Sequence, residues 1–246
     1  MKRRVGYVIA AFEGRRPART LSFEANDTLT NHLEALNACG GSSSAEVTDV
    51  LMVVNVDGFD ERDASAEPVM AGEFGSVRYR VIHRPNRGFS YGAWEAGLMR
   101  MEQLDSPPDD YFVIEDDYVP SSPAFLDCFY RFVTPTTGFV AQKWARIPGV
   151  APDHAAVSNG LIAGNALRAV IAEFGRPFSI YSGEMTAADH LMGCENQVTF
   201  LALFTSAGWE MQDISRTFSV PCQYSEGVLT ERGKEAGVAP LRPITS

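Results

Sequence analysis

The sequence has no apolar run long enough to cross a membrane, and it has few cysteines. Its longest apolar stretches, such as Leu51 to Val54, fall far short of the roughly twenty residues that a spanning helix needs, which excludes an integral membrane segment. The four cysteines are scattered, without a C-x-x-C pair or a histidine at zinc spacing. We therefore expect reduced, partly buried thiols rather than a zinc site or a disulfide framework.

The chain also lacks an excess of positive charge. It has 31 Asp and Glu against 21 Lys and Arg, a formal net charge of −10. Such a surface repels a phosphate backbone unless the bases gather in one groove, so nucleic acid is not an expected partner. A cleavable leader is not indicated either, because Glu13, Arg15 and Arg16 interrupt the first apolar stretch. We therefore predict a cytoplasmic protein.

The composition is that of a globular protein with a full core. The chain has 246 residues, 45% of them hydrophobic, and no repeat of fixed period. No long flexible linker divides it, so we expect one compact domain over residues 1–246 with two functional halves.

Strand-like and helix-like patterns alternate along the first part of the chain. Short apolar runs predict buried strands, and apolar residues spaced by three or four predict helices. The expected strands are 5–12, 50–56, 77–82, 111–114 and 138–142. Helices are expected before Gly40, at 90–104, after a Ser122–Pro123 start, at 165–174 and at 195–207. This alternation favours an α/β fold with a parallel sheet.

Three acids, Glu115, Asp116 and Asp117, directly follow the predicted strand that ends at Ile114. Ligands of open α/β sheets bind beyond the carboxyl ends of the strands. If the strand geometry persists, Glu115 and Asp117 point to one side and Asp116 to the other. Two carboxylates about 4 Å apart repel each other by roughly 4 kcal/mol at an effective dielectric constant of about 20, and a divalent cation reverses that cost. Oxygen ligands favour Mg²⁺ or Mn²⁺.

The same acids have a simpler explanation. They can be solvated loop residues that favour the positive end of the helix predicted after Ser122. The cluster alone leaves both interpretations open.

Three further stretches stand in order around this cluster, namely Val54 to Asp60 (VNVDGFD), Arg84 to Ala93 (RPNRGFSYGA), and the segment from Glu195 to Trp209. With them, the chain resembles GT-A fold nucleotide-sugar glycosyltransferases, in particular the family 2-like enzymes, over roughly residues 4 to 212. The resemblance implies a Rossmann-like α/β/α sandwich of three layers with a mostly parallel central sheet. It also implies a nucleotide-sugar-binding half at 1–120 and an acceptor half at 121–246, which includes a C-terminal tail.

The resemblance assigns the acids of the cluster to the donor. Asp117, with Glu115, would bind a metal that bridges the two phosphates, and Glu115 and Asp116 would hold the ribose or the water shell of the metal. The departing diphosphate develops negative charge that such a cation stabilises. The family usually has an aspartate where this chain has Glu115.

Three residues earlier in the chain complete the implied donor site. Asp57 would accept a hydrogen bond from the nucleotide base, although an aspartate in a turn can also bond its own backbone. Arg84 and Arg87 would neutralise the diphosphate, and the alternative for each is an ordinary surface arginine.

Glu195 is the implied general base, which in an inverting enzyme removes the proton of the acceptor hydroxyl. A glutamate in a first helical turn is also stabilised by the helix dipole without any chemical role. Glu184 and Asp189 are its rivals, and His154 or His190 could complete a metal site.

The sequence thus predicts a glycosyltransferase that moves one sugar from a UDP-sugar or GDP-sugar to a hydroxyl of a small molecule or glycan, with Mn²⁺ or Mg²⁺. Inversion is the expected outcome, and a retaining reaction, which requires no enzymic base of this kind, stays open. A single transfer is expected because the glutamine-x-x-arginine-tryptophan motif of processive synthases is absent. Two alternatives stay open. A sugar-phosphate nucleotidyltransferase would carry a glycine-rich, arginine-bearing loop after the first strand, of which residues 11–15 supply a fragment. A degenerate relative would bind nucleotide or glycan without turnover.

Overall fold

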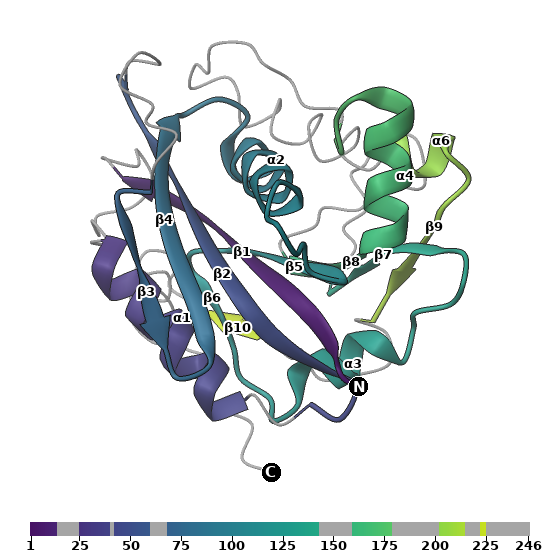
Figure 1. Ribbon diagram of the computed structural model, residues 1–246, viewed down its shortest axis with the longest axis horizontal. Helices are drawn as coiled ribbons and strands as arrows, with labels where there is room; N and C mark the ends of the chain where they lie inside the picture. The colour runs from purple at the N-terminus through teal and green to yellow at the C-terminus, as the bar shows by residue number, and fades with distance from the viewer. Residues whose placement is uncertain are drawn as a thin grey trace, which may run out of the picture.

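The computed structural model describes residues 1–13, 25–39, 42–59, 68–142, 159–178, 202–214 and 222–224. Its centre is an eight-stranded sheet with the order β3-β4-β2-β1-β5-β8-β7-β9 (Figure 1). These strands are β1 (Arg3–Glu13), β2 (Ala45–Val56), β3 (Met70–Phe74), β4 (Val77–Pro85), β5 (Asp110–Glu115), β7 (Thr137–Ala141), β8 (Asn159–Ala163) and β9 (Glu210–Asp213). A second, two-stranded sheet pairs β6 (Tyr118–Pro120) with β10 (Cys222–Tyr224).

The strand directions bring most carboxyl ends to one edge of the large sheet. β4, β2, β1 and β5 pair in parallel, and β7 pairs in parallel with β9. β8 is antiparallel to both β5 and β7, so β7 runs in the same direction as β5. We call the edge where β4, β2, β1, β5, β7 and β9 end the carboxyl edge, and the opposite edge the amino edge. β8 begins at the carboxyl edge.

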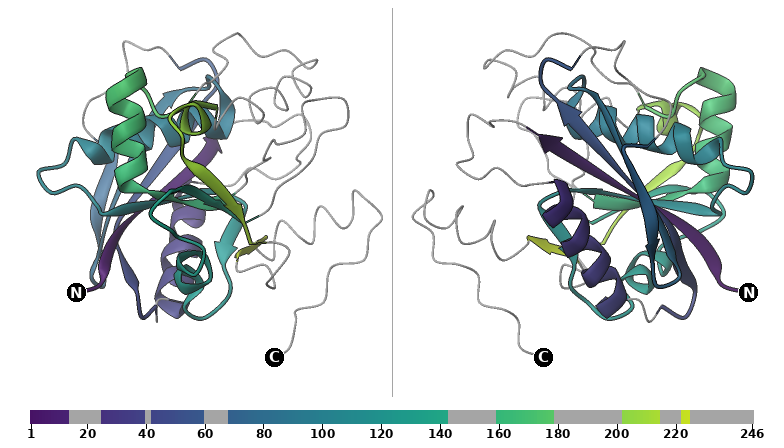
Figure 2. Two further views of the ribbon diagram at one scale, coloured as in Figure 1. Left: turned by 90° about the vertical axis from the view of Figure 1, so that its right-hand side faces the viewer. Right: turned by 60° about the vertical axis from the view of Figure 1, so that its left-hand side comes forward.

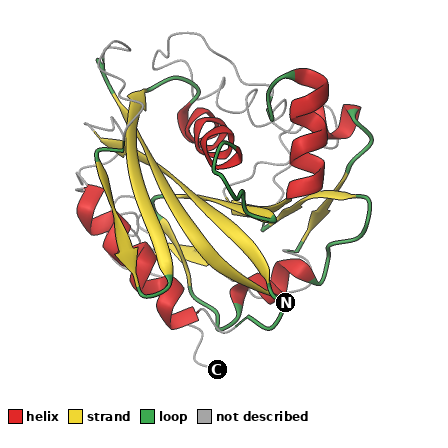
Figure 3. Ribbon diagram, viewed as in Figure 1, coloured by secondary structure: helices red, strands yellow, loops and turns green. Residues whose placement is uncertain are grey.

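Helices cover both faces of the sheet (Figures 1–3). The helices are α1 (Ala25–Cys39), α2 (Phe89–Glu102), α3 (Phe125–Tyr130), α4 (Gly164–Phe174) and α6 (Ala202–Ser206). One buried cluster joins the sheet to α2, α4 and α6, and a second joins it to α1 and α3. The predicted fold class, a three-layer α/β/α sandwich with a mostly parallel sheet, is confirmed.

The central strands form where the sequence is continuously apolar because both of their faces are buried. In β1, Val8 and Ala10 pack toward α2, whereas Tyr7 and Ile9 pack toward α1. No helix within the described ranges is both long and apolar enough to cross a bilayer. Cys39 is a buried free thiol, and Cys128 is a half-buried one.

The predicted start of α3 was wrong. Ser122 and Pro123 precede the helix, which begins at Phe125 after an N-cap residue, Ala124, whose φ is 54°. The amide of Ala124 donates to the carbonyl of Cys39 at 2.9 Å, so a tertiary contact with the end of α1 sets the helix start in place of a serine cap.

Five strands escaped prediction. Three belong to the large sheet, β3, β8 and β9, and two form the small sheet, β6 and β10. β3 forms a tight hairpin with β4 through Gly75 and Ser76. β3 is an exposed edge strand, so it lacks the buried apolar run on which the prediction depended. β8 is short, although all five of its residues are buried.

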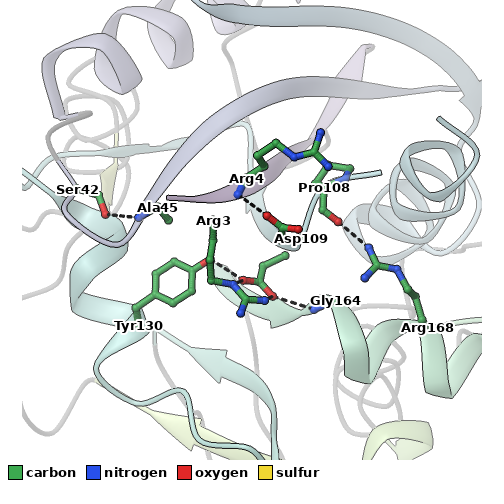
Figure 4. A network of polar contacts seen from close by, with 10 residues as sticks. Arg3, Arg4, Ser42, Ala45, Pro108, Asp109, Tyr130, Gly164 and Arg168 are labelled. Atoms are coloured by element: carbon green, nitrogen blue, oxygen red, sulfur yellow. Dashed lines mark hydrogen bonds and ion pairs between the residues drawn. The ribbon is translucent and has the colours of Figure 1, made fainter. Parts of the chain in front are cut away.

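A polar network ties the elements together at the amino edge (Figure 4). The buried carboxylate of Asp110, at the start of β5, accepts hydrogen bonds from Nη2 of Arg3 at 2.8 Å, the Tyr130 hydroxyl at 2.7 Å and the Gly164 amide at 3.0 Å. Arg3 Nε also donates to this carboxylate. The beginnings of β1, β5 and α4 and the end of α3 are thereby joined at a single side chain.

Candidate active site

The three acids that follow Ile114 lie at the carboxyl edge, each in a different environment. β5 ends at Glu115, Asp116 and Asp117 form a turn, and β6 starts at Tyr118. The strand therefore does not persist beyond Glu115, and the expected alternation of side chains does not apply to the two aspartates. The three carboxylates therefore differ in their contacts and burial.

Glu115 is half-buried and is held by α2. The Ser90 hydroxyl donates to Oε1 of Glu115 at 2.7 Å. One turn further along the helix, the indole Nε1 of Trp94, which is fully buried, donates to the carbonyl of Ile114 at 2.9 Å. The first two turns of α2 thus fix the end of β5 through both its main chain and its last side chain.

Asp116 joins the turn to β1. Its amide donates to the Ala10 carbonyl at 2.9 Å, and its Oδ2 accepts a bond from the Phe12 amide at 3.2 Å. The carboxylate therefore accepts a hydrogen bond from a backbone amide at the end of β1, as a carbonyl of a neighbouring strand would. The predicted contact of Asp116 with a ribose or a metal-bound water stays a prediction.

Asp117 is the most deeply buried of the three, with 1% of its surface exposed. Burying an ionised carboxylate is costly unless hydrogen-bond donors or a cation compensate. Within the described ranges, no group of three or more His, Cys, Asp or Glu side chains is arranged to hold a metal ion. The predicted contact of Glu115 and Asp117 with Mg²⁺ or Mn²⁺ stays a prediction. Their chemistry suits such an ion, because Mg²⁺ commonly takes one or two carboxylates and completes its shell with water and substrate phosphates.

A buried histidine lies next to the backbone of Asp116. His32 of α1 is fully buried, and its Nδ1 is 3.0 Å from the Tyr7 hydroxyl. Burial lowers the pKa of His32 to about 4, and the nearby backbone of Asp116 opposes this shift. The imidazole is therefore neutral near pH 7 and adds no charge to the site.

Asp57 lies exposed in the turn that follows β2. The side-chain amide of Asn86 donates to Oδ1 of Asp57 at 2.9 Å, and the backbone amide of Asn86 donates to the Val56 carbonyl at 3.3 Å. Asp57 is thus oriented by a contact with the loop after β4. Its predicted contact with a nucleotide base stays a prediction.

Arg84 organises the loop between β4 and α2. Its Nη1 donates to Oδ1 of Asn55 at 2.7 Å and to the carbonyl of Arg87 at 3.0 Å, and the Asn55 amide donates to the Phe89 carbonyl at 3.0 Å. Burial lowers the pKa of Arg84. Arg87 is exposed on the same loop, and the predicted contacts of both arginines with a diphosphate stay predictions.

Sequence reasoning missed four residues at this edge, namely Asn55, Asn86, Ser90 and Asn159. The first three lie in or beside the segments 54–60 and 84–93, where the motif itself was the available signal. Asn159 had none. It pairs with Ile114 across the sheet, it is fully buried, and neither polar atom of its amide finds a hydrogen-bond partner among the described residues.

The predicted base and its rivals lie outside the described residues. This applies to Glu195 and to its rivals Glu184 and Asp189, and it applies equally to His154 and His190, the candidates for completing a metal site. The residues that the structure describes are therefore the ones predicted to contact the donor.

Solved structures share this arrangement of sheet and helices. The catalytic domain of Drosophila β1,4-galactosyltransferase 7, solved with xylobiose, matches with a TM-score of 0.50 and 10% identity over 90% of this chain and 70% of that chain. The chain has a GT-A fold. A mannosyltransferase from Pyrobaculum calidifontis, solved with GDP-Man and Mn²⁺, matches with a TM-score of 0.48 and 10% identity over 87% of this chain and 55% of that chain.

The same GT-A architecture also resembles an enzyme class with different chemistry. A glucose-1-phosphate thymidylyltransferase candidate from Bacillus anthracis matches with a TM-score of 0.50 and 12% identity over 99% of this chain and 97% of that chain. No model of a known protein family matches the sequence, and a search of curated proteins finds no relative. The activity must therefore be argued from the residues of the site, because one fold supports several functions.

Proposed function

We propose that this protein is a divalent-metal-dependent glycosyltransferase that moves one sugar from a nucleotide diphosphate sugar to an acceptor hydroxyl. The observation that carries the proposal is the pair of carboxylates at the carboxyl edge of a GT-A sheet, with Asp117 buried and Glu115 held by Ser90. Ligands of open α/β sheets bind at this edge.

The donor nucleotide is assigned to the ends of β1, β2 and β4. Asp57, oriented by Asn86, is the proposed acceptor of a hydrogen bond from the base of UDP or GDP. Glu115 and Asp116 are the proposed ribose contacts. Arg87 stands exposed on the loop that Arg84 organises, where a guanidinium can pair with phosphate oxygens.

Glu115 and Asp117 would hold Mg²⁺ or Mn²⁺. When bound, such a cation neutralises the charge that develops on the departing nucleoside diphosphate. The protein contributes two oxygen ligands and a partly desolvated site, in which opposite charges attract more strongly than in water.

In the proposed inverting reaction, Glu195 accepts the proton of the acceptor hydroxyl. The hydroxyl oxygen forms a bond to the anomeric carbon as the bond from that carbon to the diphosphate oxygen breaks, and the nucleoside diphosphate leaves. The proposed role of Glu195 rests on the sequence resemblance alone, because this residue lies outside the described residues.

A nucleotidyltransferase is the second candidate, and one observation favours it. The thymidylyltransferase candidate from Bacillus anthracis covers 99% of this chain at the same TM-score as the galactosyltransferase. The two activities differ in their products. A glycosyltransferase releases a nucleoside diphosphate from a nucleotide sugar, whereas a nucleotidyltransferase releases pyrophosphate from a nucleoside triphosphate and a sugar phosphate.

The test measures both products with the purified protein. UDP-sugars and GDP-sugars are supplied with Mn²⁺, with Mg²⁺ or with a chelator, and nucleoside diphosphate release by hydrolysis or transfer is followed. We expect release only with a divalent cation. Pyrophosphate formation from a nucleoside triphosphate and a sugar 1-phosphate would instead establish the second candidate, and binding without turnover would indicate a degenerate relative.

Asp117→Asn tests the metal assignment, because it keeps the volume of the side chain and removes its charge. We expect a loss of at least a hundredfold in nucleoside diphosphate release with the fold retained by circular dichroism. The control is Asp105→Asn, at an exposed position beyond α2, which should leave the rate unchanged. Full activity of Asp117→Asn would defeat the metal assignment.

A further inference from the structure

The first two turns of α2 present two donors to the end of β5. Ser90 and Trp94 are four residues apart and so lie on the same face of the helix. The Ser90 hydroxyl donates to Oε1 of Glu115 at 2.7 Å, and the Trp94 indole donates to the Ile114 carbonyl at 2.9 Å. One bond holds the main chain of the strand, and the other holds the side chain that follows it.

Ser90 does not act as a helix cap. The N-cap of α2 is Gly88, which makes no side-chain capping bond, and Ser90 is the second helical residue. Serine inside a helix is less favourable than alanine, so the helix gains nothing from a hydroxyl at this position. The contact that this hydroxyl does make is with Glu115.

The backbone that leads to Ser90 is strained and held in place. Phe89 has a φ of 51°, in the left-handed region that bulky residues rarely adopt, and it follows Gly88, whose φ of 71° is unstrained for a glycine. Asn55 holds the carbonyl of Phe89, and Arg84 holds Asn55. Strained residues persist where surrounding contacts over-determine them, and here those contacts set the direction from which Ser90 approaches Glu115.

We propose that Ser90 is a positioning residue, which fixes the carboxylate of Glu115 for the divalent cation and the donor nucleotide. The inference rests on the proposed function. A hydrogen bond to a ligating carboxylate fixes its plane before the ligand arrives, and loss of such a supporting bond typically lowers metal affinity by 10-fold to 100-fold. Ser90 itself touches neither substrate nor metal.

The experiment measures binding rather than turnover. Isothermal titration calorimetry follows UDP and GDP binding to the full chain at fixed Mn²⁺, and Mn²⁺ affinity is measured by electron paramagnetic resonance with the nucleotide present. The variants are Ser90→Ala, Ser90→Thr, Glu115→Ala and the double variant Ser90→Ala with Glu115→Ala. The matched control is Ser106→Ala, which removes an exposed hydroxyl that accepts a bond from Arg4 at the amino edge.

We expect Ser90→Ala to weaken Mn²⁺ binding by about tenfold or more, with an unfolding midpoint close to that of the unaltered protein. Ser90→Thr, which keeps a hydroxyl, should restore most of the affinity, and Ser106→Ala should change nothing. In the Glu115→Ala background, removal of the Ser90 hydroxyl should have no further effect, since its partner is gone.

Two results would overturn the inference while the proposed function stands. One is wild-type Mn²⁺ affinity in Ser90→Ala. The other is an equal loss of affinity on removing the hydroxyl with and without Glu115, which would mean that Ser90 acts through the fold. If the unaltered protein shows no metal-dependent nucleotide binding at all, the proposed function and the inference fail together.

Discussion

At the scale of single residues, His32 links the stability of the protein to pH. The folded protein keeps this imidazole fully buried, which lowers its pKa to about 4, whereas in the unfolded chain the pKa is close to 6.5. Between these two values the unfolded chain binds a proton that the folded protein excludes. Stability from this residue is therefore complete above about pH 6.5 and falls as the pH drops toward 4.

We expect the free energy of unfolding to decrease by up to roughly 3 kcal/mol over this window, as measured by urea denaturation at several pH values. His32→Gln should flatten the dependence between pH 6.5 and 4. Asp127 serves as an internal reference. Burial would raise its pKa, but hydrogen bonds from Ser42, Ser43 and Ser44 prevail and lower it to about 2, so its contribution is lost only below about pH 4. An unchanged slope in His32→Gln would contradict the assignment.

Residues also show what the sequence could predict of the site. Glu115 and Asp117 were predicted at the carboxyl edge because a buried strand visibly ends before them. The hydrogen bond of Asp116 with the Phe12 amide was not predictable, because it depends on the pairing of β1 with β5. Asn159 left no local signal, because its place opposite Ile114 follows from the pairing of strands 45 positions apart.

At the scale of elements, α2 is fitted closely to the loop that precedes it. A Cβ atom added at Gly92 would lie 2.0 Å from the Arg87 carbonyl oxygen and 2.8 Å from Nη1 of Arg84. The first obstacle is backbone, which cannot rotate away as a side chain can. Relief requires the loop and the helix to separate, and that would disturb Ser90 and Glu115.

We therefore expect Gly92→Ala to cost about 1–3 kcal/mol of stability and also to weaken nucleotide binding. Thermal unfolding and calorimetry with UDP or GDP measure the two effects. Gly72→Ala is the control, because the atoms that its Cβ meets belong to the outer ring of Tyr79, which can move. Retention of wild-type stability in Gly92→Ala would show that the contact relaxes without cost.

Four of the strands that were predicted correctly share one physical property, and one helix end was marked by its glycine. β1, β2, β5 and β7 carry near-continuous apolar runs because both of their faces are covered, and the end of α4 at Gly175 has the left-handed glycine, with a φ of 76°, that helix ends favour. β3 and the start of α3 failed for the opposite reason. An exposed edge strand needs no apolar run, and a contact with Cys39 fixes the start of α3.

At the scale of the whole molecule, the contacts that stabilise the fold and the proposed site lie at opposite edges of the sheet. The amino edge is joined by Asp110, and the proposed chemistry lies at the carboxyl edge. Removal of the Asp110 carboxylate leaves Arg3, Tyr130 and the Gly164 amide without the acceptor they share, and breaking a buried charged contact is strongly destabilising.

We expect Asp110→Ala to lower the free energy of unfolding by roughly 3 kcal/mol, as measured by chemical denaturation, while the folded protein keeps its nucleotide affinity. Glu46→Ala, at an exposed position near the start of β2, is the control and should change neither quantity. A selective loss of nucleotide binding in folded Asp110→Ala would show that the two edges are coupled.

The reversed direction of β8 has a practical consequence for engineering. Because β7 and β8 are antiparallel neighbours, the chain leaves the sheet at Gln142 and returns at Asn159, where the Gln142 amide donates to the Asn159 carbonyl at 3.0 Å. Residues 143–158 are thus bracketed by two adjoining anchor points. A segment of different length taken from another protein could be inserted between them at little entropic cost. Doubling the length of a flexible loop raises the free energy of loop closure by only about 0.6 kcal/mol. The junction is a natural insertion point for chimeras that leave the sheet intact.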